Sequence, residues 1–170
     1  MLRILGIDPG SRVTGYGIIE SNGVKSAHVV NGALRMRDDE FPPRLGQIFT
    51  GICQVIDEFQ PEVMAIEQVF VSKNPASALK LGQARGAAIC AAVSRRLEVV
   101  EYTPTRIKQA VVGTGRAEKE QVQHMVQLIL GLPERPVADA ADALAVALSH
   151  AHTGSTLKRL MTNNNRDQRL

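Results

Sequence analysis

The chain has 170 residues, of which 44% are hydrophobic, and this is enough to bury one sizeable core but too little for two. No apolar run approaches the roughly 18 to 20 residues of a membrane span, and the N-terminus lacks the apolar stretch of a signal peptide, so we expect a cytoplasmic protein without a membrane segment. The net charge is +3, and residues 153–170 hold four basic residues against one acid, so the body is neutral. Charge therefore permits a nucleic-acid partner without requiring one.

The first third of the chain predicts an antiparallel meander of three strands. A short apolar run over 2–7 is followed by a turn at Pro9-Gly10-Ser11 and by a second strand over 15–19. Asn22-Gly23 between apolar runs is a strong hairpin signal, and it leads to a third strand over 24–34.

From residue 42 the apolar period changes to that of a helix. The elements expected after this helix are a strand over 63–71, a helix over 76–96, a strand over 99–102, and helices over 104–112, 119–130 and 138–150. A meander followed by βαβ crossovers predicts an α/β fold: a mixed five-stranded sheet with helices on both faces, in one domain over 1–152. Residues 153–170 are predicted to be a disordered basic tail. Cys53 and Cys90 have no partner at metal-ligand spacing and are predicted to be core residues.

Four carboxylates stand where apolar residues are expected. Glu67 interrupts an apolar strand, where an unpaired charge costs several kcal/mol. Asp8 ends the first strand, and Asp139 and Asp142 lie three residues apart on the helix face that packs on the sheet. Each acid also has a simpler interpretation: Glu67 could pair with a buried arginine, Asp8 could be a turn residue, and Asp139 could cap its helix.

The chemistry of such a group of acids points to metal ions. Carboxylates packed together raise one another's pKa unless a cation neutralises them, and hard oxygen ligands select Mg²⁺ or Mn²⁺. A carboxylate site holding two such ions about 3.5 to 4 Å apart hydrolyses phosphodiesters by in-line displacement. We therefore expect a Mg²⁺-dependent nuclease, with Mn²⁺ as a substitute and two ions per active site during catalysis.

Four blocks of sequence, with Asn74, carry a family resemblance: GIDPGSRVTGYG over 6–17, AIEQVF over 65–70, SALKLGQARG over 77–86 and DAADALA over 139–145. In this order they resemble the RuvC family of bacterial Holliday-junction resolvases, from residue 2 to about 152. The resemblance implies a ribonuclease H-like fold. It also implies a homodimer that nicks a four-way DNA junction symmetrically in recombination and DNA repair, together with the branch-migration proteins RuvA and RuvB. By position, Asp8, Glu67, Asp139 and Asp142 match the family's catalytic, metal-binding acids.

The resemblance also implies DNA contacts. Phe70 is either a core aromatic or, as the resemblance favours, a wedge that stacks against an unpaired base. Basic DNA contacts are implied around Gly113-Thr114-Gly115, and the other basic side chains expected to reach phosphates are spread over the first half of the chain. Each of them alone is as readily a solvated surface charge. The basic residues in question are Arg12, Lys73, Lys80, Arg85, Lys108, Arg116 and Lys119.

The helix over 76–96 is rich in Gly and Ala, so another element can approach it closely. That element is either the sheet of the same chain or a second subunit, and we expect a dimer interface that includes Ala88. Two rival functions remain open. One is an ATPase of the actin and sugar-kinase type, because residues 6–11 resemble its first phosphate loop, although the chain lacks a second such loop. The other is a junction-binding module without catalysis.

Overall fold

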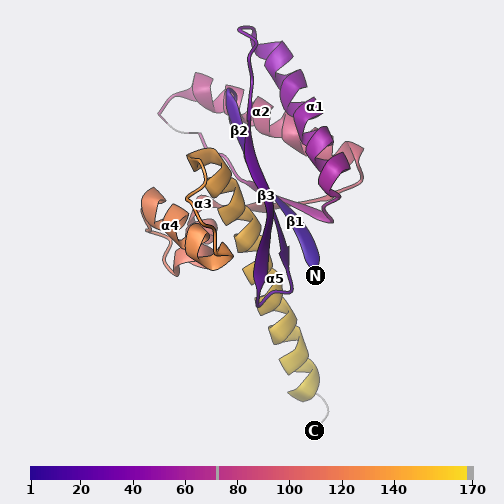
Figure 1. The fold of residues 1–170 in the computed structure, drawn as a ribbon, viewed down its shortest axis with the longest axis vertical. Helices are drawn as coiled ribbons and strands as arrows, with labels where there is room; N and C mark the ends of the chain where they lie inside the picture. Colours follow the sequence, from indigo (N-terminus) through magenta and orange to yellow (C-terminus); the bar gives the residue numbers. More distant parts are fainter. Residues whose placement is uncertain (72, 168–170) are drawn as a thin grey trace.

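Five strands form one mixed sheet in the order β3-β2-β1-β4-β5 (Figure 1). The computed structural model describes residues 1–71 and 73–167, with the backbone alone for 154–167. The strands are β1 (Leu2–Asp8), β2 (Val13–Ser21), β3 (Ser26–Arg35), β4 (Val63–Glu67) and β5 (Glu98–Tyr102). The pairs β1–β2 and β2–β3 are antiparallel, whereas β1–β4 and β4–β5 are parallel. The predicted meander and mixed five-stranded sheet are confirmed.

Helices cover both faces of this sheet. They are α1 (Phe41–Phe59), α2 (Pro75–Ser94), α3 (Pro104–Val112), α4 (Lys119–Leu130) and α5 (Ala138–Asp167). α1 and α2 pack on one face, here called the α1/α2 face, and α5 packs on the other with α3 and α4 beside it, here called the α5 face (Figure 1). No helix within the described residues is long and apolar enough to cross a membrane.

Two predicted elements end four or more residues away from the expected position. β4 stops at Glu67 instead of 71, because its last partner in the short strand β5 is Tyr102, and residues 69–71 are no longer part of the sheet. α5 continues to Asp167 instead of ending at 150, so residues 153–167, predicted to be disordered, are helical. This stretch contains no proline that would stop a helix. Residues 168–170 of the predicted tail lie outside the described residues.

The alternation of side chains along the strands decides which residues reach the α5 face. On β1, Ile4, Gly6 and Asp8 point to that face. β4 runs parallel beside β1 with Ala65 opposite Gly6, so Glu67 comes next to Asp8. The two acids are therefore neighbours on one face at the ends of two adjacent strands.

Glycines in β1 and β2 let α5 lie directly on the sheet. A Cβ on Gly6 would lie 2.0 Å from a backbone oxygen of α5, and a Cβ on Gly15 would lie 2.0 Å from the carbonyl oxygen of Asp139. Gly15 is the residue opposite Asp8 in the β1–β2 ladder. The start of α5, with Asp139 and Asp142, is thus held against the strands beside Asp8.

α2 carries small side chains on both of its faces. Ala88 is fully buried against the sheet with the other alanines of that side, so the prediction that Ala88 lies in a dimer interface is wrong. The opposite side, here called the outer face of α2, consists of Leu79, Gly82, Gly86, Cys90 and Val93. Cys90 is exposed there, so the prediction that it is a core residue is also wrong, whereas Cys53 is buried as expected.

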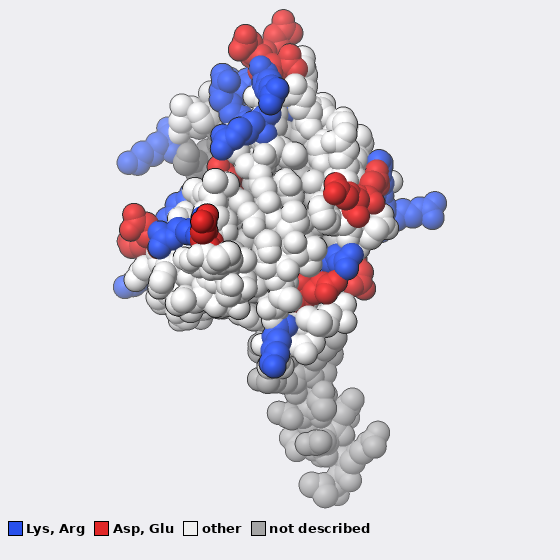
Figure 2. Space-filling model, in the orientation of Figure 1, with Lys and Arg blue, Asp and Glu red and all other residues white. Residues whose placement is uncertain are grey.

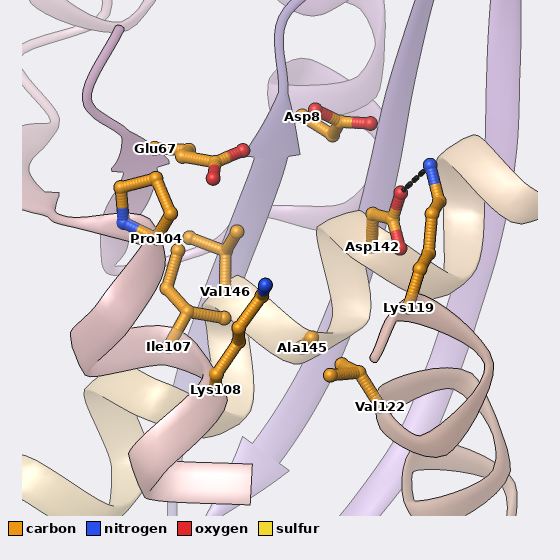
Figure 3. A pocket seen from close by; sticks show the side chains of 10 residues that line it. All are labelled: Asp8, Glu67, Pro104, Ile107, Lys108, Lys119, Val122, Asp142, Ala145 and Val146. Atoms are coloured by element: carbon orange, nitrogen blue, oxygen red, sulfur yellow. Dashed lines mark ion pairs between the residues drawn. The ribbon is translucent and has the colours of Figure 1, made fainter. Parts of the chain in front are cut away.

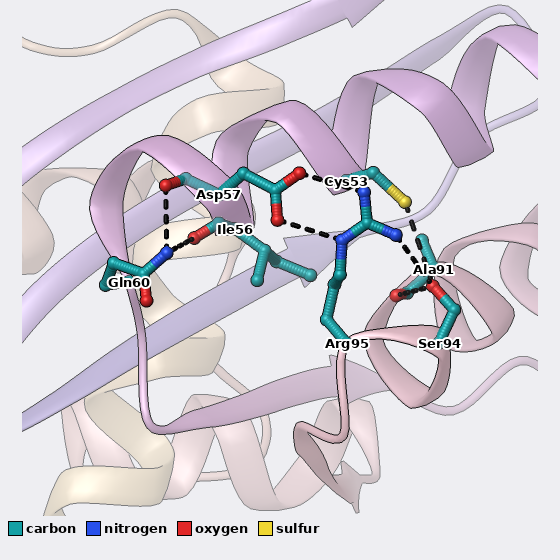
Figure 4. A network of polar contacts seen from close by, with 7 residues as sticks. All are labelled: Cys53, Ile56, Asp57, Gln60, Ala91, Ser94 and Arg95. Atoms are coloured by element: carbon teal, nitrogen blue, oxygen red, sulfur yellow. Dashed lines mark hydrogen bonds and ion pairs between the residues drawn. The ribbon is translucent and has the colours of Figure 1, made fainter.

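The C-terminal ends of α1 and α2 are joined by an ion pair. Arg95, which follows α2, donates from Nε and Nη2 to the two carboxylate oxygens of Asp57 in α1, each at 2.8 Å (Figure 4). Beside this pair, the Ser94 hydroxyl donates to the carbonyl of Ala91 and lies 3.9 Å from the Cys53 sulfur. These contacts are on the α1/α2 face, away from the carboxylates of the α5 face.

Candidate active site

Asp8, Glu67 and Asp142 line one pocket of about 340 Å³ at the ends of β1 and β4 (Figure 3). Asp8 and Glu67 are the last residues of their strands, and Asp142 reaches in from the second turn of α5. The remaining lining comes from α3, α4 and α5: Pro104, Ile107, Lys108, Lys119, Val122, Ala145 and Val146. The sheet and α5 thus bring together three acids that are far apart in the sequence.

Asp139 lies at the edge of the same group. It is half-buried one turn before Asp142, and its side chain is not part of the pocket lining. α5 begins at Ala138, so Asp139 lies inside the first turn and not at the cap position. Its charge contributes to the raised pKa of Asp8, as the smallest of the causes, so it is within electrostatic reach of the pocket.

Burial raises the pKa of Asp8 from 3.8 to about 7, and the charges of Asp142 and Glu67 add to this effect. Lys119 acts in the opposite direction. The pKa of Glu67 is raised as well, first by burial and then by the charge of Asp142. Burial and the neighbouring carboxylates therefore both disfavour ionisation of these two acids.

Two lysines supply the positive charge nearest to these acids. Lys119, the first residue of α4, donates to Oδ2 of Asp142 at 2.6 Å, and Figure 3 marks this ion pair. Lys108 lines the pocket from α3, and its charge acts on Glu67. Within the described residues, no three His, Cys, Asp or Glu side chains converge closely enough to hold one metal ion as they stand. The carboxylates line the pocket, but their oxygens do not converge on a single position that one metal ion could occupy.

The simpler interpretations of Glu67 and Asp8 do not hold. The Glu67 carboxylate belongs to none of the ion pairs among the described residues. Arg85 donates from Nε to the Glu67 backbone carbonyl, and not to its carboxylate, at 2.9 Å. The turn after Asp8 is closed by Thr14, whose buried hydroxyl donates to a carbonyl within the turn at 2.8 Å. Both carboxylates are thus left facing the pocket.

Arg85 itself was expected to contact phosphate, and the structure gives it a different setting. Its side chain is only 15% exposed. Besides the bond to Glu67, its Nη2 lies 3.0 Å from Oε2 of Glu101 on β5, an ion-pair contact without hydrogen-bond geometry. The guanidinium therefore links α2 to the ends of β4 and β5 inside the protein.

The other basic residues expected to contact DNA remain accessible. Lys108 and Lys119 lie at the pocket, and Arg116 is exposed on the connection just before α4. Exposed positions outside the pocket are Arg12 before β2, Lys73 before α2, and Lys80 on α2, whose Nζ lies 5.8 Å from the centre of the Phe41 ring.

Phe70 is 64% exposed in the loop that follows Glu67. The interpretation as a core aromatic is therefore wrong.

Two contributors were not found from the sequence. The glycines of β1 and β2 that seat α5 could have been suspected, since a glycine inside a strand often marks a close backbone approach. Arg35, the last residue of β3, lies opposite Val13 in the β2–β3 ladder, and the backbone N–H of Met36 donates to the Arg12 carbonyl at 2.9 Å. Figure 2 shows Lys and Arg side chains gathered where β3 leads into α1, next to a group of acids. No sequence signal reveals that neighbourhood before the strand register is known.

Comparison with known proteins gives matches over most of the chain. The family model of crossover junction endodeoxyribonuclease RuvC matches residues 4–150. A relative of that name from Shewanella woodyi is 59% identical over 160 residues, which are 94% of this chain and 92% of the relative. Another from Aliivibrio salmonicida is 60% identical over 154 residues, or 91% and 89%. The solved structure of Thermus thermophilus RuvC in complex with a Holliday junction substrate has 35% sequence identity and a TM-score of 0.85, and the match covers 92% of this chain and 96% of that chain.

Proposed function

The chain belongs to the RuvC family of crossover junction endodeoxyribonucleases, and we propose that Asp8, Glu67, Asp139 and Asp142 are the acids with which it hydrolyses DNA. Like its relatives it is an endonuclease that resolves Holliday junctions, and it has their ribonuclease H-like fold. This membership removes the rival interpretation as an ATPase. The observation that carries the catalytic assignment is the meeting of three acids from β1, β4 and α5 in one pocket.

Divalent metal ions fit this group of acids. All the donors are carboxylate oxygens, the ligands that Mg²⁺ and Mn²⁺ prefer. The pKa values of Asp8 and Glu67 are raised, first by burial and then by neighbouring carboxylates, and a bound cation would favour the ionised form of both acids. We propose that the four acids hold Mg²⁺, replaceable by Mn²⁺, with two ions per site during catalysis. When bound, such ions supply a nucleophilic water and stabilise the leaving oxygen.

The basic residues bind and orient the DNA backbone. Lys108 and Lys119 stand on the helical side of the pocket, where a phosphate approaching the acids meets both ammonium groups. Arg12, Lys73, Lys80 and Arg116 extend this contact over the neighbouring surface, and exposed Arg35, on β3 opposite Val13, is a further candidate. Because these contacts are electrostatic, junction affinity should fall steeply as the salt concentration rises.

Phe70 opens the bases next to the cleaved phosphate. Its exposed ring lies in the loop that follows β4, which ends in Glu67. It can therefore stack on an unpaired base of the DNA while the phosphate backbone of that DNA strand enters the pocket. In Phe70→Ala, a junction should still bind through its phosphates and be nicked more slowly.

A second copy of the chain packs on the outer face of α2. Leu79 and Val93 are 71% and 60% exposed at its two ends, and an added Cβ at Gly82 or Gly86 would meet nothing within 4 Å. A symmetric dimer supplies the two active sites that paired nicks require. Gly86→Leu should leave the monomer fold intact, since the space is open and glycine is a poor helix former, and should shift the sedimentation coefficient to that of a monomer. A dimer that persists in Gly86→Leu and Gly82→Leu would contradict this interface.

The junction itself is the test of the proposed activity. A synthetic four-way junction incubated with Mg²⁺ should be nicked at paired positions by the wild type, whereas a matched linear duplex should not. Asp8→Asn should lose at least about 10²-fold in cleavage rate while retaining junction affinity, because it removes a metal ligand and leaves the phosphate contacts in place. Asp57→Asn, an exposed acid far from the pocket, is the matched control.

Two outcomes of this assay would count against the proposal. Binding of the junction by the wild type without any nick would favour the non-catalytic module. Undiminished cleavage by Asp8→Asn would remove Asp8 from the site. We further propose that residues 1–152 form the nuclease domain and that RuvA and RuvB are its partners at the junction, as the resemblance implies.

A further inference from the structure

Lys119 forms an ion pair with Asp142, one of the acids proposed to hold the metal ion. Its Nζ is 2.6 Å from Oδ2 of Asp142, and this is the only ion pair of a pocket acid among the described residues. The Asp142 side chain is 20% exposed and lines the pocket, so the ammonium stands where a cation in the pocket would also be attracted. The same ammonium also acts on Asp8 and Asp139, so it serves as a counter-charge for the group as a whole.

The Lys119 side chain is free to move away from Asp142. Its side chain is 62% exposed, it stands at the first turn of α4, and its aliphatic stem ends in a point charge without a fixed hydrogen-bonding direction. The cap of α4 is made by Glu118 and Gln121, so the helix start does not depend on where the Lys119 side chain points.

We propose that Lys119 is a built-in competitor of the metal ion: without DNA it holds Asp142, and a phosphate of the bound strand draws it away and frees the carboxylate for the metal. An ammonium and a divalent cation on the same carboxylate repel each other, so each weakens the binding of the other. A DNA phosphate is the alternative partner that Lys119 can reach. Among the described residues, no three acids converge on one point while Lys119 holds Asp142. This inference rests on the proposed metal-dependent function and adds an order to it, in which DNA binding favours metal binding.

Titration calorimetry of Mn²⁺ into the DNA-free protein tests the competition. Lys119→Met should bind Mn²⁺ at least about fivefold more tightly than the wild type, because the competing cation is gone. Lys119→Arg keeps the positive charge and should stay near the wild type. Lys108 lines the same pocket but forms none of the ion pairs among the described residues. Lys108→Met should therefore change the Mn²⁺ affinity by less than about twofold. Equal gains in Lys119→Met and Lys108→Met, or no gain in Lys119→Met, would overturn the proposal.

A second measurement tests the role of DNA. Junction binding is measured on a gel with and without Ca²⁺, which binds oxygen ligands in flexible geometry. Any cleavage that Ca²⁺ supports is seen on the same gel. The factor by which Ca²⁺ strengthens junction binding equals the factor by which the junction strengthens Ca²⁺ binding. This factor should be several-fold larger in the wild type than in Lys119→Met, and equal factors would overturn the proposal.

The outcomes separate this inference from the function on which it rests. A wild type that nicks junctions with Mn²⁺ and binds this ion no more weakly than Lys119→Met retains the proposed function and loses only the competition. A wild type that neither binds Mn²⁺ nor cleaves with it loses both.

Discussion

The two faces of the sheet are covered in different ways. On the α5 face, glycines of β1 and β2 place the helix backbone directly on the strands, with no side chain between them at Gly6 and Gly15. On the α1/α2 face, large side chains such as Ile7 and Ile18 meet Ile48 and others from the helices. Where two backbones touch, an added methyl group cannot be accommodated by a rotamer change, whereas packed side chains can adjust their rotamers. The acids of the site lie on the α5 face, which tolerates added side-chain volume less well.

The largest effect is expected where the backbones touch. In Gly15→Ala the new Cβ would lie 2.0 Å from the Asp139 carbonyl oxygen and 2.4 Å from its carbon, so the start of α5 must move. We expect the free energy of unfolding to fall by about 3 kcal/mol or more. Cleavage should fall by about 10²-fold even in the folded fraction, because a displacement of about 1 Å moves Asp139 and Asp142 out of place. Thermal unfolding and a junction-nicking assay measure the two effects.

The matched control lies on the other face. In Gly51→Ala the new Cβ would lie 2.7 Å from the end of the flexible Leu34 side chain, which can move away. Alanine also favours the helix by about 1 kcal/mol over glycine, so stability should stay the same or rise. If both alanine variants lost stability equally, the distinction between the two faces would be wrong.

Arg85 is the point at which the α1/α2 face reaches the active site. It extends from α2 and donates to the backbone carbonyl of Glu67, so it positions this acid without touching the reacting atoms. Arg85→Met should reduce the cleavage rate by about 10- to 100-fold, the range for residues that orient metal ligands. The junction Kd should not change, and this distinguishes positioning from a phosphate contact. Partial recovery in Arg85→Lys would support the hydrogen bond as the cause, and a weaker Kd in either variant would return Arg85 to the DNA contacts.

The acids of the α5 face should also lower the stability of the metal-free protein. The pKa of Asp8 is about 7 in the folded protein and near 3.8 when unfolded, so the folded state binds the proton more tightly. The free energy of unfolding therefore falls as the pH rises from about 4 to about 7 and stays low above this range. Asp8→Asn removes the destabilisation that comes from ionising the buried Asp8. Its Tm without metal should exceed that of the wild type by at least about 2 °C near pH 8, with no difference near pH 4. Equal Tm values near pH 8 would contradict the raised pKa.

Much of the fold could be predicted from the sequence, because strand alternation, the Asn-Gly hairpin and helical periods are local signals. The same signals placed Asp8, Glu67 and Asp142 near one another. They could not say which side of α2 is buried, because both Ala88 and Gly86 are small and the helix shows no apolar stripe. The contact between Lys119 and Asp142 depends on how α4 packs against α5, which has no local signal.

The smallest effect is expected at the ion pair between α1 and α2 (Figure 4). The hydrogen bonds from Arg95 lower the pKa of Asp57 in the folded protein, so the stabilising contribution is present above the unfolded pKa of 3.8 and is lost as the pH falls below it. Both groups are exposed, so solvent and salt screen the pair. Asp57→Asn should lower the Tm slightly at neutral pH and low salt, with a difference that shrinks in high salt and at acidic pH, and cleavage should be unchanged. A clear loss of cleavage in Asp57→Asn would mean that contacts between the helices of the α1/α2 face do control the position of the acids, and the separation between the two faces would then have to be abandoned.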